Sequence, residues 1–446
     1  MLQKIYNLSP IFFQNLMTSV KGYQIFKQRY NKYYQEEFQK LVETENKFQL
    51  QEERLKEFYN YIVNNSKYFA EYKKIIADDL KIEDLYKLPI MEKEDLRLYI
   101  DELVTRKDNL IELGTGGTTG KSVKFFSHPI DMSKKIAYLD YFKAKHGVFL
   151  GMRRVSIGGQ PIVPPSQKKK IFWRYNYLLN QLYFSAFHAD GENIKYYIEQ
   201  LNEFKPQTID GFPSVIHRLA KYINNNNIKL DFKPIAIFPT AETLTEEVKN
   251  DIEKAFDCPV RDQYASSEGA PFITENNRGE LEINPETGVF ELKKVENNIY
   301  ELIVTGFYTT TTPLLRYQIG DSVELYKELP ENYKQKDIKI KRIIGRKNDF
   351  LVSKERGVIT AGLASVLKPL DNMVKESQFI QNKIDEIIIK LVVDNSADRN
   401  KIEKILTNNL NTRFGNSTKY VFEYVDEIER TSGGKTRFII NNLKDW

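Results

Sequence analysis

The chain has 446 residues, which is too long for a single hydrophobic core and indicates two or three domains. Hydrophobic residues make up 41% and charged residues 28% of it, as in an ordinary soluble globular protein, and the net charge of +5 from 66 basic and 61 acidic side chains gives no sign of nucleic-acid binding. The single cysteine, Cys258, excludes an internal disulfide and a cysteine-cluster zinc site, and we infer a cytoplasmic location.

An apolar stretch near the N-terminus resembles the start of a signal peptide. Gln14, Asn15 and Lys21 interrupt it, no small-residue cleavage motif follows, and it is too short and polar to span a bilayer. We instead predict a helix with Ser9 as its N-cap and Pro10 as its first residue. One face of this helix would carry its apolar side chains, Phe13, Leu16, Met17 and Val20. We expect this helix to pack on the body of the protein, and a membrane-surface helix is the alternative.

The pattern of the chain changes near residue 115. Residues 28–79 are rich in Glu, Lys, Gln and Tyr with no internal Gly or Pro, which predicts helices. Beyond 115, short apolar runs such as 235–238 alternate with amphipathic segments at 192–204, 213–223 and 245–256. This alternation is typical of an α/β domain with parallel strands, whose ligands bind at loops beyond the carboxyl ends of the strands. Two such loops are 238–243 and 262–269.

We therefore predict an α/β fold with two domains. The large N-terminal domain would span 1–346, with 1–100 mainly helical, and a small α+β domain would span 347–446. The second domain has its own predicted strands at 386–393 and 420–425 and a helix at 399–411.

A loop rich in Gly and Thr, LGTGGTTGKSVKFF at 113–126, suggests phosphate binding. It departs from a Walker loop because Thr115 stands where that pattern needs glycine, and because a β-branched and aromatic run follows where a helix should begin. Small residues and hydroxyls still suit a nest of backbone N–H groups around an anion. A flexible surface loop fits this segment, taken alone, equally well.

Five motifs occur in a fixed order: this loop, Tyr-x-x-Ser-Glu, Arg-Tyr-x-x-Gly-Asp, Gly-Arg-x-x-Asp and a late Gly-Gly-Lys. Together with the stretches YNLSPIFFQNL, YKLPIMEKEDL and IDGFPSVIHRLAKYI, they resemble the adenylate-forming superfamily of acyl-CoA synthetases and ligases. Within it, the chain is most similar to the phenylacetate:coenzyme A ligase-like branch and its CapK-type proteins, which are associated with cell-surface polysaccharide gene sets. Five ordered motifs are a strong signal, although each alone is weak.

The resemblance implies roles for individual residues in ATP binding. The phosphate loop would hold the β- and γ-phosphates through Thr115, Gly117, Thr118, Thr119 and Gly120. Gly116 and Ser122 replace the Ser and Pro usual in the family, and the roles of Lys121 and Lys124 stay open. Ala241 and Glu242 match the adenine-binding turn, Tyr264 would stack on adenine, and Asp321 would accept the ribose hydroxyls. Arg346 would lie near ribose and phosphate.

The resemblance also implies a catalytic set. Ser267 stands where a Thr usually contacts the α-phosphate, and Glu268 would hold Mg²⁺, a hard cation that prefers carboxylate and phosphate oxygens. Thr118 would act within the phosphate loop, Lys435 matches the catalytic lysine of the mobile C-terminal domain, and Asn348 falls at the hinge. Each residue alone has a simpler interpretation as a packing, turn or solvated side chain.

The acid-binding pocket is less clearly marked. Small and aromatic residues that follow predicted strands would line it: Gly158, Phe212, Pro213 and Ser214. His188 could face the same pocket, although a packing role is favoured. The four histidines lack metal-ligand spacing, so no zinc site is expected.

The reaction implied by the resemblance is formation of an acyl-adenylate and pyrophosphate from ATP and a carboxylic acid, followed by transfer to coenzyme A or to another thiol or amine. Alternatives are a non-catalytic nucleotide-binding or scaffold protein of the same fold and, with less support, a P-loop NTPase. The sequence does not identify the acid or the acceptor, nor does it decide between a monomer and a homodimer.

Overall fold

The computed structural model describes residues 2–114, 124–160, 162–164, 167–189, 191–242, 244, 246–296, 298–345, 351–359, 363–370, 373–394, 397–429 and 439–443. The N-terminal part is helical, as predicted, with α1 (Leu2–Leu8), α2 (Ile11–Arg29), α3 (Lys32–Glu43), α4 (Lys47–Asn65), α5 (Lys67–Ala70), α6 (Lys93–Leu98) and α7 (Ile100–Leu103). Asparagine side chains cap two of these helices. Asn31 accepts a hydrogen bond from the Tyr33 backbone N–H, and Asn46 accepts one from that of Gln49.

Two details of the prediction for α2 are wrong. Pro10, rather than Ser9, is the N-cap, and the Ser9 hydroxyl turns back to the preceding helix, where it donates to the Ile5 carbonyl at 2.8 Å. The predicted apolar face does not pack on the body, since Phe13 and Leu16 are exposed. The helix is held through its opposite, polar face, where hydrogen bonds take the place of apolar burial.

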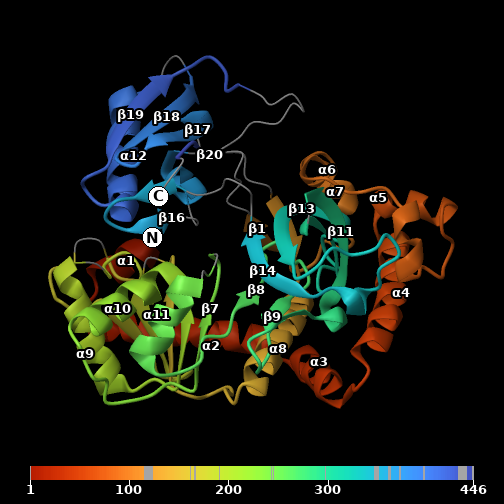
Figure 1. Cartoon of the computed structure of the whole chain (residues 1–446), viewed down its shortest axis with the longest axis horizontal. Coiled ribbons are helices and arrows are strands. Elements are labelled where there is room, and N and C mark those ends of the chain that lie inside the picture. Colours follow the sequence, from red (N-terminus) through yellow and green to blue (C-terminus); the bar gives the residue numbers. More distant parts are fainter. Residues whose placement is uncertain are drawn as a thin grey trace.

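A five-stranded sheet forms the first half of the α/β core. Its order is β4 (Trp173–Asn176), β5 (Gln181–Ser185), β3 (Arg154–Gly158), β6 (Thr208–Gly211) and β7 (Ala236–Pro239); the last four are parallel, and β4 is an antiparallel edge. Three helices cover one face, α9 (Ile194–Phe204), α10 (Pro213–Asn225) and α11 (Glu246–Phe256), while α2 and α8 (Pro129–Lys145) lie on the other (Figure 1). These elements confirm the predicted parallel α/β unit.

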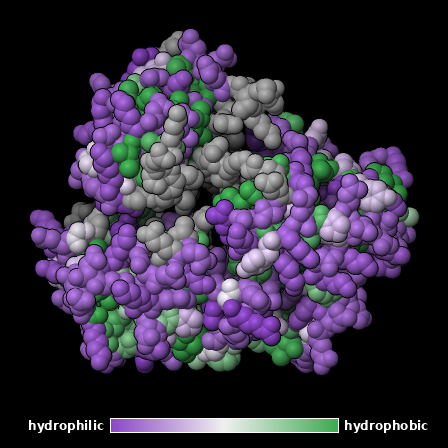
Figure 2. Space-filling model, in the orientation of Figure 1, coloured by the Kyte–Doolittle hydropathy of each residue, from purple (hydrophilic) through white to green (hydrophobic). Residues whose placement is uncertain are grey.

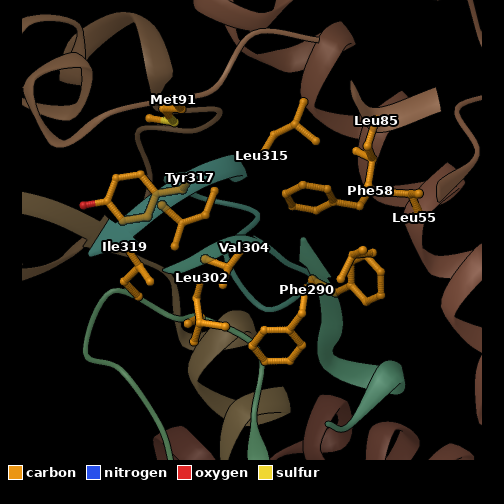
Figure 3. Packing of buried hydrophobic residues seen from close by; sticks show 14 of the residues in the cluster. Leu55, Phe58, Leu85, Met91, Phe290, Leu302, Val304, Leu315, Tyr317 and Ile319 are labelled. Carbon is orange, nitrogen blue, oxygen red and sulfur yellow. The ribbon is translucent and has the colours of Figure 1, made fainter. Parts of the chain in front are cut away.

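A seven-stranded antiparallel sheet forms the second half and was not predicted. Its order is β11 (Gly288–Glu296), β12 (Ile299–Gly306), β13 (Leu314–Leu325), β14 (Ile340–Gly345), β10 (Leu281–Ile283), β9 (Ile273–Glu275) and β8 (Gln263–Tyr264). Figure 3 shows Leu55 and Phe58 of α4 packed beside Phe290 of the sheet, with Tyr317 of β13 in the same buried cluster. A separate hairpin joins β1 (Ile111–Gly114) to β2 (Lys124–Ser127).

The C-terminal elements form an α+β unit with its own core. The hairpin of β15 (Leu351–Ser353) and β16 (Gly357–Ile359) precedes a sheet in the order β19 (Lys419–Tyr424), β18 (Glu386–Val393), β17 (Val374–Lys383) and β20 (Ile439–Asn441), and α12 (Arg399–Phe414) packs on it. The strands predicted at 386–393 and 420–425 and the helix at 399–411 are therefore confirmed. The predicted domain boundary at 346 and 347 lies outside the described residues. Within the described part of the chain, no helix has the length and apolarity that crossing a membrane requires.

Candidate active site

The carboxyl edge of the parallel sheet gathers the residues predicted to line the acid pocket. The Phe212 backbone N–H donates to the Ile157 carbonyl at 3.1 Å, and that of Thr240 donates to the Gly211 carbonyl at 2.9 Å, so the ends of β3, β6 and β7 are joined. Gly211 has a φ of +156°, and a Cβ there would lie 2.3 Å from the Ile157 carbonyl oxygen, so a side chain would clash with β3.

Space is left open at this edge beside Gly158. A Cβ added to Gly158 would meet no atom within 4 Å, whereas one added to the next residue, Gly159, would lie 3.4 Å from the Phe212 ring. Pro213 is buried as the first residue of α10, and the Ser214 backbone follows in the same helix. Gly158 and Phe212 thus lie on the side of the sheet where a ligand is expected.

His188 is held by its neighbours rather than directed into open space. Its Nδ1 lies 2.8 Å from the Ser185 hydroxyl oxygen, and its ring stacks on Phe172 with centroids 5.2 Å apart. These contacts favour the packing role over a direct part in acid binding.

The predicted adenine turn follows β7. Ala241 adopts a left-handed conformation with φ +69°, and the Gln263 side chain donates to the Pro239 carbonyl at 3.2 Å, which fastens the turn to β8. Arg413 of α12 is close enough to Glu242 for their charges to interact: burial lowers the pKa of the guanidinium, and the Glu242 carboxylate acts in the opposite direction. The turn therefore has a cationic neighbour from the C-terminal unit that the sequence did not indicate.

Tyr264 and Asp321 come together from β8 and β13. The Tyr264 hydroxyl donates to Asp321 Oδ2 at 2.7 Å across a separation of 57 residues, and the Tyr264 ring packs against the core of the seven-stranded sheet. Gly320, which precedes Asp321, has a φ of +84°. The structure thus pairs the residues predicted to contact the base and the ribose.

Glu268 lies in the loop after β8 beside a cation that sequence analysis missed. Lys135 of α8 donates from Nζ to the Ser266 carbonyl at 2.8 Å and interacts electrostatically with Glu268. Burial lowers the pKa of Lys135 to about 8, while the Glu268 and Asp131 carboxylates act in the opposite direction. Sequence gave little hint of this, because the pair Lys134-Lys135 reads as part of a solvated helix face.

The Glu268 carboxylate suits a magnesium ion that is completed by phosphate oxygens. Ser267 is exposed, and its hydroxyl donates to Glu268 Oε2 at 3.1 Å. No group of three or more His, Cys, Asp or Glu side chains in the described residues is arranged to hold a metal alone. A single carboxylate that supplements phosphate ligands is the usual mode of Mg²⁺ binding at nucleotide sites.

A buried cluster of ion pairs holds the start of the loop that contains Tyr264 and Glu268. Glu275, at 2% exposure, pairs with Lys249 at 2.8 Å and with Arg261 at 2.9 Å. Its Oε2 also accepts a hydrogen bond from the Asp262 backbone N–H. Burial raises the pKa of the Asp262 carboxyl from its ordinary value of 3.8 to about 6. This cluster fixes the start of the Tyr264 loop against α11.

The predicted phosphate loop lies between β1 and β2. Its residues Thr115, Gly117, Thr118, Thr119 and Gly120 fall outside the described part of the chain, as do Arg346, Asn348 and Lys435. The strands on either side pair antiparallel, with Gly114 opposite Lys124. A strand, β2, follows the loop as its β-branched and aromatic residues indicated, which argues against a Walker loop. Lys124 forms an exposed ion pair with Glu112 at 3.1 Å.

Comparisons with known proteins agree with this architecture. Protein CapK of Staphylococcus aureus is 60% identical over 449 residues, with 100% of both chains covered. The family model described as the CapK C-terminal domain matches residues 351–442.

Solved structures show the same fold at low sequence identity. For 2-hydroxyisobutyryl-CoA ligase with 2-HIB-AMP and CoA in the thioesterification state, the identity is 17%, the coverage is 89% of this chain and 90% of that one, and the TM-score is 0.58. For the same ligase with 2-HIB-AMP in the postadenylation state, these values are 16%, 88%, 89% and 0.51. The fold is therefore that of the adenylate-forming ligases, as predicted, and the full-length identity shows that the chain belongs to the CapK family.

Proposed function

We propose that this chain activates a carboxylic acid with ATP, forming an acyl-adenylate and pyrophosphate, and then transfers the acyl group to coenzyme A or to another thiol or amine. The observation that carries the proposal is the hydrogen bond between Tyr264 and Asp321. It sets an aromatic ring next to an acceptor-only carboxylate, which is the pair of groups needed to hold a base and a ribose. The turn at Ala241 and Glu242 follows β7, which pairs with β6, and β6 in turn pairs with β3, where Gly158 lies at the open edge.

In this proposal each region of the site has a separate task. Tyr264 and Asp321 bind the nucleoside, and the phosphate loop of residues 115–120 binds the β- and γ-phosphates with help from Arg346. Gly158, Phe212, Pro213 and Ser214 border the acid. The acid carboxylate attacks the α-phosphorus, and the bond to pyrophosphate breaks as the acyl–phosphate bond forms, so no protein nucleophile is needed.

The chain supplies cations and hydrogen-bond donors where phosphate charge must be stabilised. Ser267 lies beside Glu268 and would donate to the α-phosphate, while Lys135 places its ammonium group behind the same loop. Lys435 of the C-terminal unit would approach from the other side, as the family resemblance implies. A magnesium ion held by Glu268 would neutralise part of the phosphate charge when bound.

The acceptor and the pathway are the finer parts of the proposal. The printed description of the solved ligase names CoA, which supports coenzyme A as an acceptor. Kinship with CapK supports a place in cell-surface polysaccharide biosynthesis, where an amine or a carrier-bound thiol is an equally suitable acceptor. We infer that the acid is small. A phenylacetate-like aryl acid would suit the open space at Gly158, with the aromatic ring of Phe212 nearby.

Exchange of labelled pyrophosphate into ATP, measured over a panel of carboxylic acids, tests the proposal. We expect exchange that depends on one class of acid and that falls by several orders of magnitude in Glu268→Gln. The exposed Glu280→Gln is the matched control and should retain full exchange. Nucleotide binding without exchange for any acid would indicate the non-catalytic alternative, and release of ADP with phosphate would contradict adenylation.

A further inference from the structure

The outer face of α2 is apolar, and nothing in the described part of the chain covers it. The inner face is held by hydrogen bonds: Gln14 accepts from Arg174 Nε at 2.5 Å, and the Ser19 hydroxyl accepts from the Tyr177 backbone N–H at 3.1 Å. Gly22 packs so closely on Asn176 that a Cβ would lie 2.1 Å from its amide nitrogen. The polar and small side of the helix thus faces the protein, and the large apolar residues point outward.

The exposed apolar residues begin on α1 and continue along α2. Leu8 is 87% exposed and Phe12 is 67% exposed. We call this stripe the α1–α2 apolar face, and it consists of Ile5, Leu8, Phe12, Phe13, Leu16, Val20 and Tyr23. In α2 these residues recur at spacings of three and four, so they project from one side of the helix. Contiguous apolar surface of this extent usually marks a binding site.

Two turns from the neighbouring sheet extend this face. Tyr177 and Leu178, both exposed, occupy the turn between β4 and β5, which the Ser19 hydrogen bond ties to α2. Asn180 in the same turn donates to the Gly151 carbonyl at 3.2 Å and so brings the loop with exposed Phe149 close by. The apolar residues therefore come from three separate segments at one edge of the molecule.

The charged residues of the segment that carries this face are all of one sign. Residues 5–35 contain Lys21, Lys27, Arg29 and Lys32 and no acidic residue, although the whole chain is nearly balanced at 66 basic and 61 acidic side chains. Lys27 lies on the apolar side of α2, with its ammonium group 4.8 Å from the centre of the Tyr23 ring. An apolar stripe on a segment whose own charged residues are all cations is the pattern of a helix that lies in the interface of an anionic bilayer.

We propose that the α1–α2 apolar face binds an anionic membrane surface, with α2 parallel to the bilayer plane and its lysines at the headgroups. A second copy of this chain is a weaker candidate, because a two-fold contact through this face would bring the same lysines together with no acidic residue to pair with them. In Figure 1, α2 runs behind the five-stranded sheet. The front face in Figure 2 is mainly hydrophilic with scattered apolar residues.

Co-sedimentation of the full chain with large unilamellar vesicles tests this proposal. We expect binding to vesicles of phosphatidylcholine with 30% phosphatidylglycerol, and little binding to phosphatidylcholine alone. Phe12→Ser combined with Leu16→Ser should weaken binding by at least about tenfold, since two inserted side chains are lost. Lys21→Glu combined with Lys27→Glu should weaken it by about 25-fold or more, at about fivefold for each lysine removed.

Control variants distinguish binding through the α1–α2 apolar face from nonspecific adsorption to vesicles. Tyr86→Ser removes another exposed aromatic residue, and Lys327→Glu with Lys339→Glu removes the same charge elsewhere; both should bind as the unchanged protein does. All the substituted residues are exposed, and the least exposed of the apolar ones, Leu16, is 48% exposed. The substitutions should therefore leave the melting temperature unchanged. Equal binding by the α2 variants and the controls would overturn the proposal. So would a dimer in analytical ultracentrifugation that Phe12→Ser with Leu16→Ser dissociates, since the face would then bind a second copy.

Discussion

The Tyr264 hydroxyl and the Asp321 carboxylate are 2.7 Å apart, although the residues are separated by 57 positions in the chain. The contact orients both groups before any nucleotide arrives. An oriented acceptor loses less freedom on binding than a mobile one, so part of the ordering cost of ATP binding is already met by the fold.

Substitutions at this pair should therefore change nucleotide affinity in distinct ways. Asp321→Ala removes up to two charge-assisted hydrogen bonds, each of about 1.5–3 kcal/mol, and should weaken ATP and inosine triphosphate equally. Tyr264→Phe keeps the ring and should weaken both nucleotides by only about tenfold. Isothermal titration calorimetry measures both effects. If Asp321→Ala lost affinity for ATP but kept its affinity for inosine triphosphate, Asp321 would contact the base instead of the ribose.

Lys135 should contribute to adenylation through its charge. Lys135→Met keeps most of the side-chain volume but removes the ammonium group beside Glu268, and we expect pyrophosphate exchange to fall by about 100-fold, in line with the loss of one preorganised electrostatic group. Lys134→Met, at the adjacent position, removes the same charge and is the control. If the two variants lost exchange equally, the effect would come from overall charge and Lys135 would have no specific role.

The electrostatic attraction between Arg413 and Glu242 should help to hold the C-terminal unit in its position. Arg413→Glu would set two carboxylates against each other, so we expect a larger radius of gyration in small-angle X-ray scattering and faster proteolysis near residues 346–350. The double variant Glu242→Arg with Arg413→Glu restores opposite charges and should reverse both changes. Lys404→Glu on the exposed side of α12 is the control. A double variant as open as the single one would show that the pair does not hold the units together.

The two half-reactions should respond differently to Lys435 and Asn348. If the C-terminal unit swings between two positions, Lys435→Ala abolishes pyrophosphate exchange and largely spares transfer from a supplied acyl-adenylate. Asn348→Pro should do the reverse, because proline fixes φ at the predicted hinge. Rapid-quench assays of each half-reaction distinguish these outcomes. Equal loss of both steps in a folded Lys435→Ala enzyme would mean that one conformation performs both.

Asp262 should make stability depend on pH in a narrow range. Its pKa rises from 3.8 to about 6 because burial disfavours the charged form, so the folded state binds more protons than the unfolded state between these values. Stability from this residue is therefore complete below about pH 3.8 and is lost as the pH rises through about 6. In Asp262→Asn, the gain in melting temperature over the unchanged protein should grow between pH 4 and 6 and then level off. A constant difference would contradict the shifted pKa.

The sequence predicted those elements whose signals are local. β7 is a short apolar run followed by the amphipathic helix α11, so both were located from their own residues. Consecutive strands pair in much of the antiparallel sheet, but the pairing of β10 with β14 that completes it joins distant segments, Leu281 and Ile340, and the sheet as a whole was missed. Nothing local to either strand indicates that the other exists.

For a similar reason, membership of a motif did not reveal what each residue does in the fold. Arg316 belongs to the Arg-Tyr-x-x-Gly-Asp motif, yet it binds Glu291 through two nitrogens and the Tyr86 and Leu88 carbonyls, which makes it a structural clamp. Lys135 has no motif at all, and only the fold places it beside Glu268. The order of motifs identified the family, whereas the distances between side chains decide which residues are close enough to act together.

The hydrogen bonds and close packing that hold α2 on the protein have an evolutionary consequence. Gln14, Ser19 and Gly22 specify the position of the helix by matching donors, acceptors and shape, so substitutions among them should be strongly constrained. The outward residues contribute little to folding, so the fold itself does not constrain them. Single substitutions among the outward residues can therefore change what the α1–α2 apolar face binds without altering the fold.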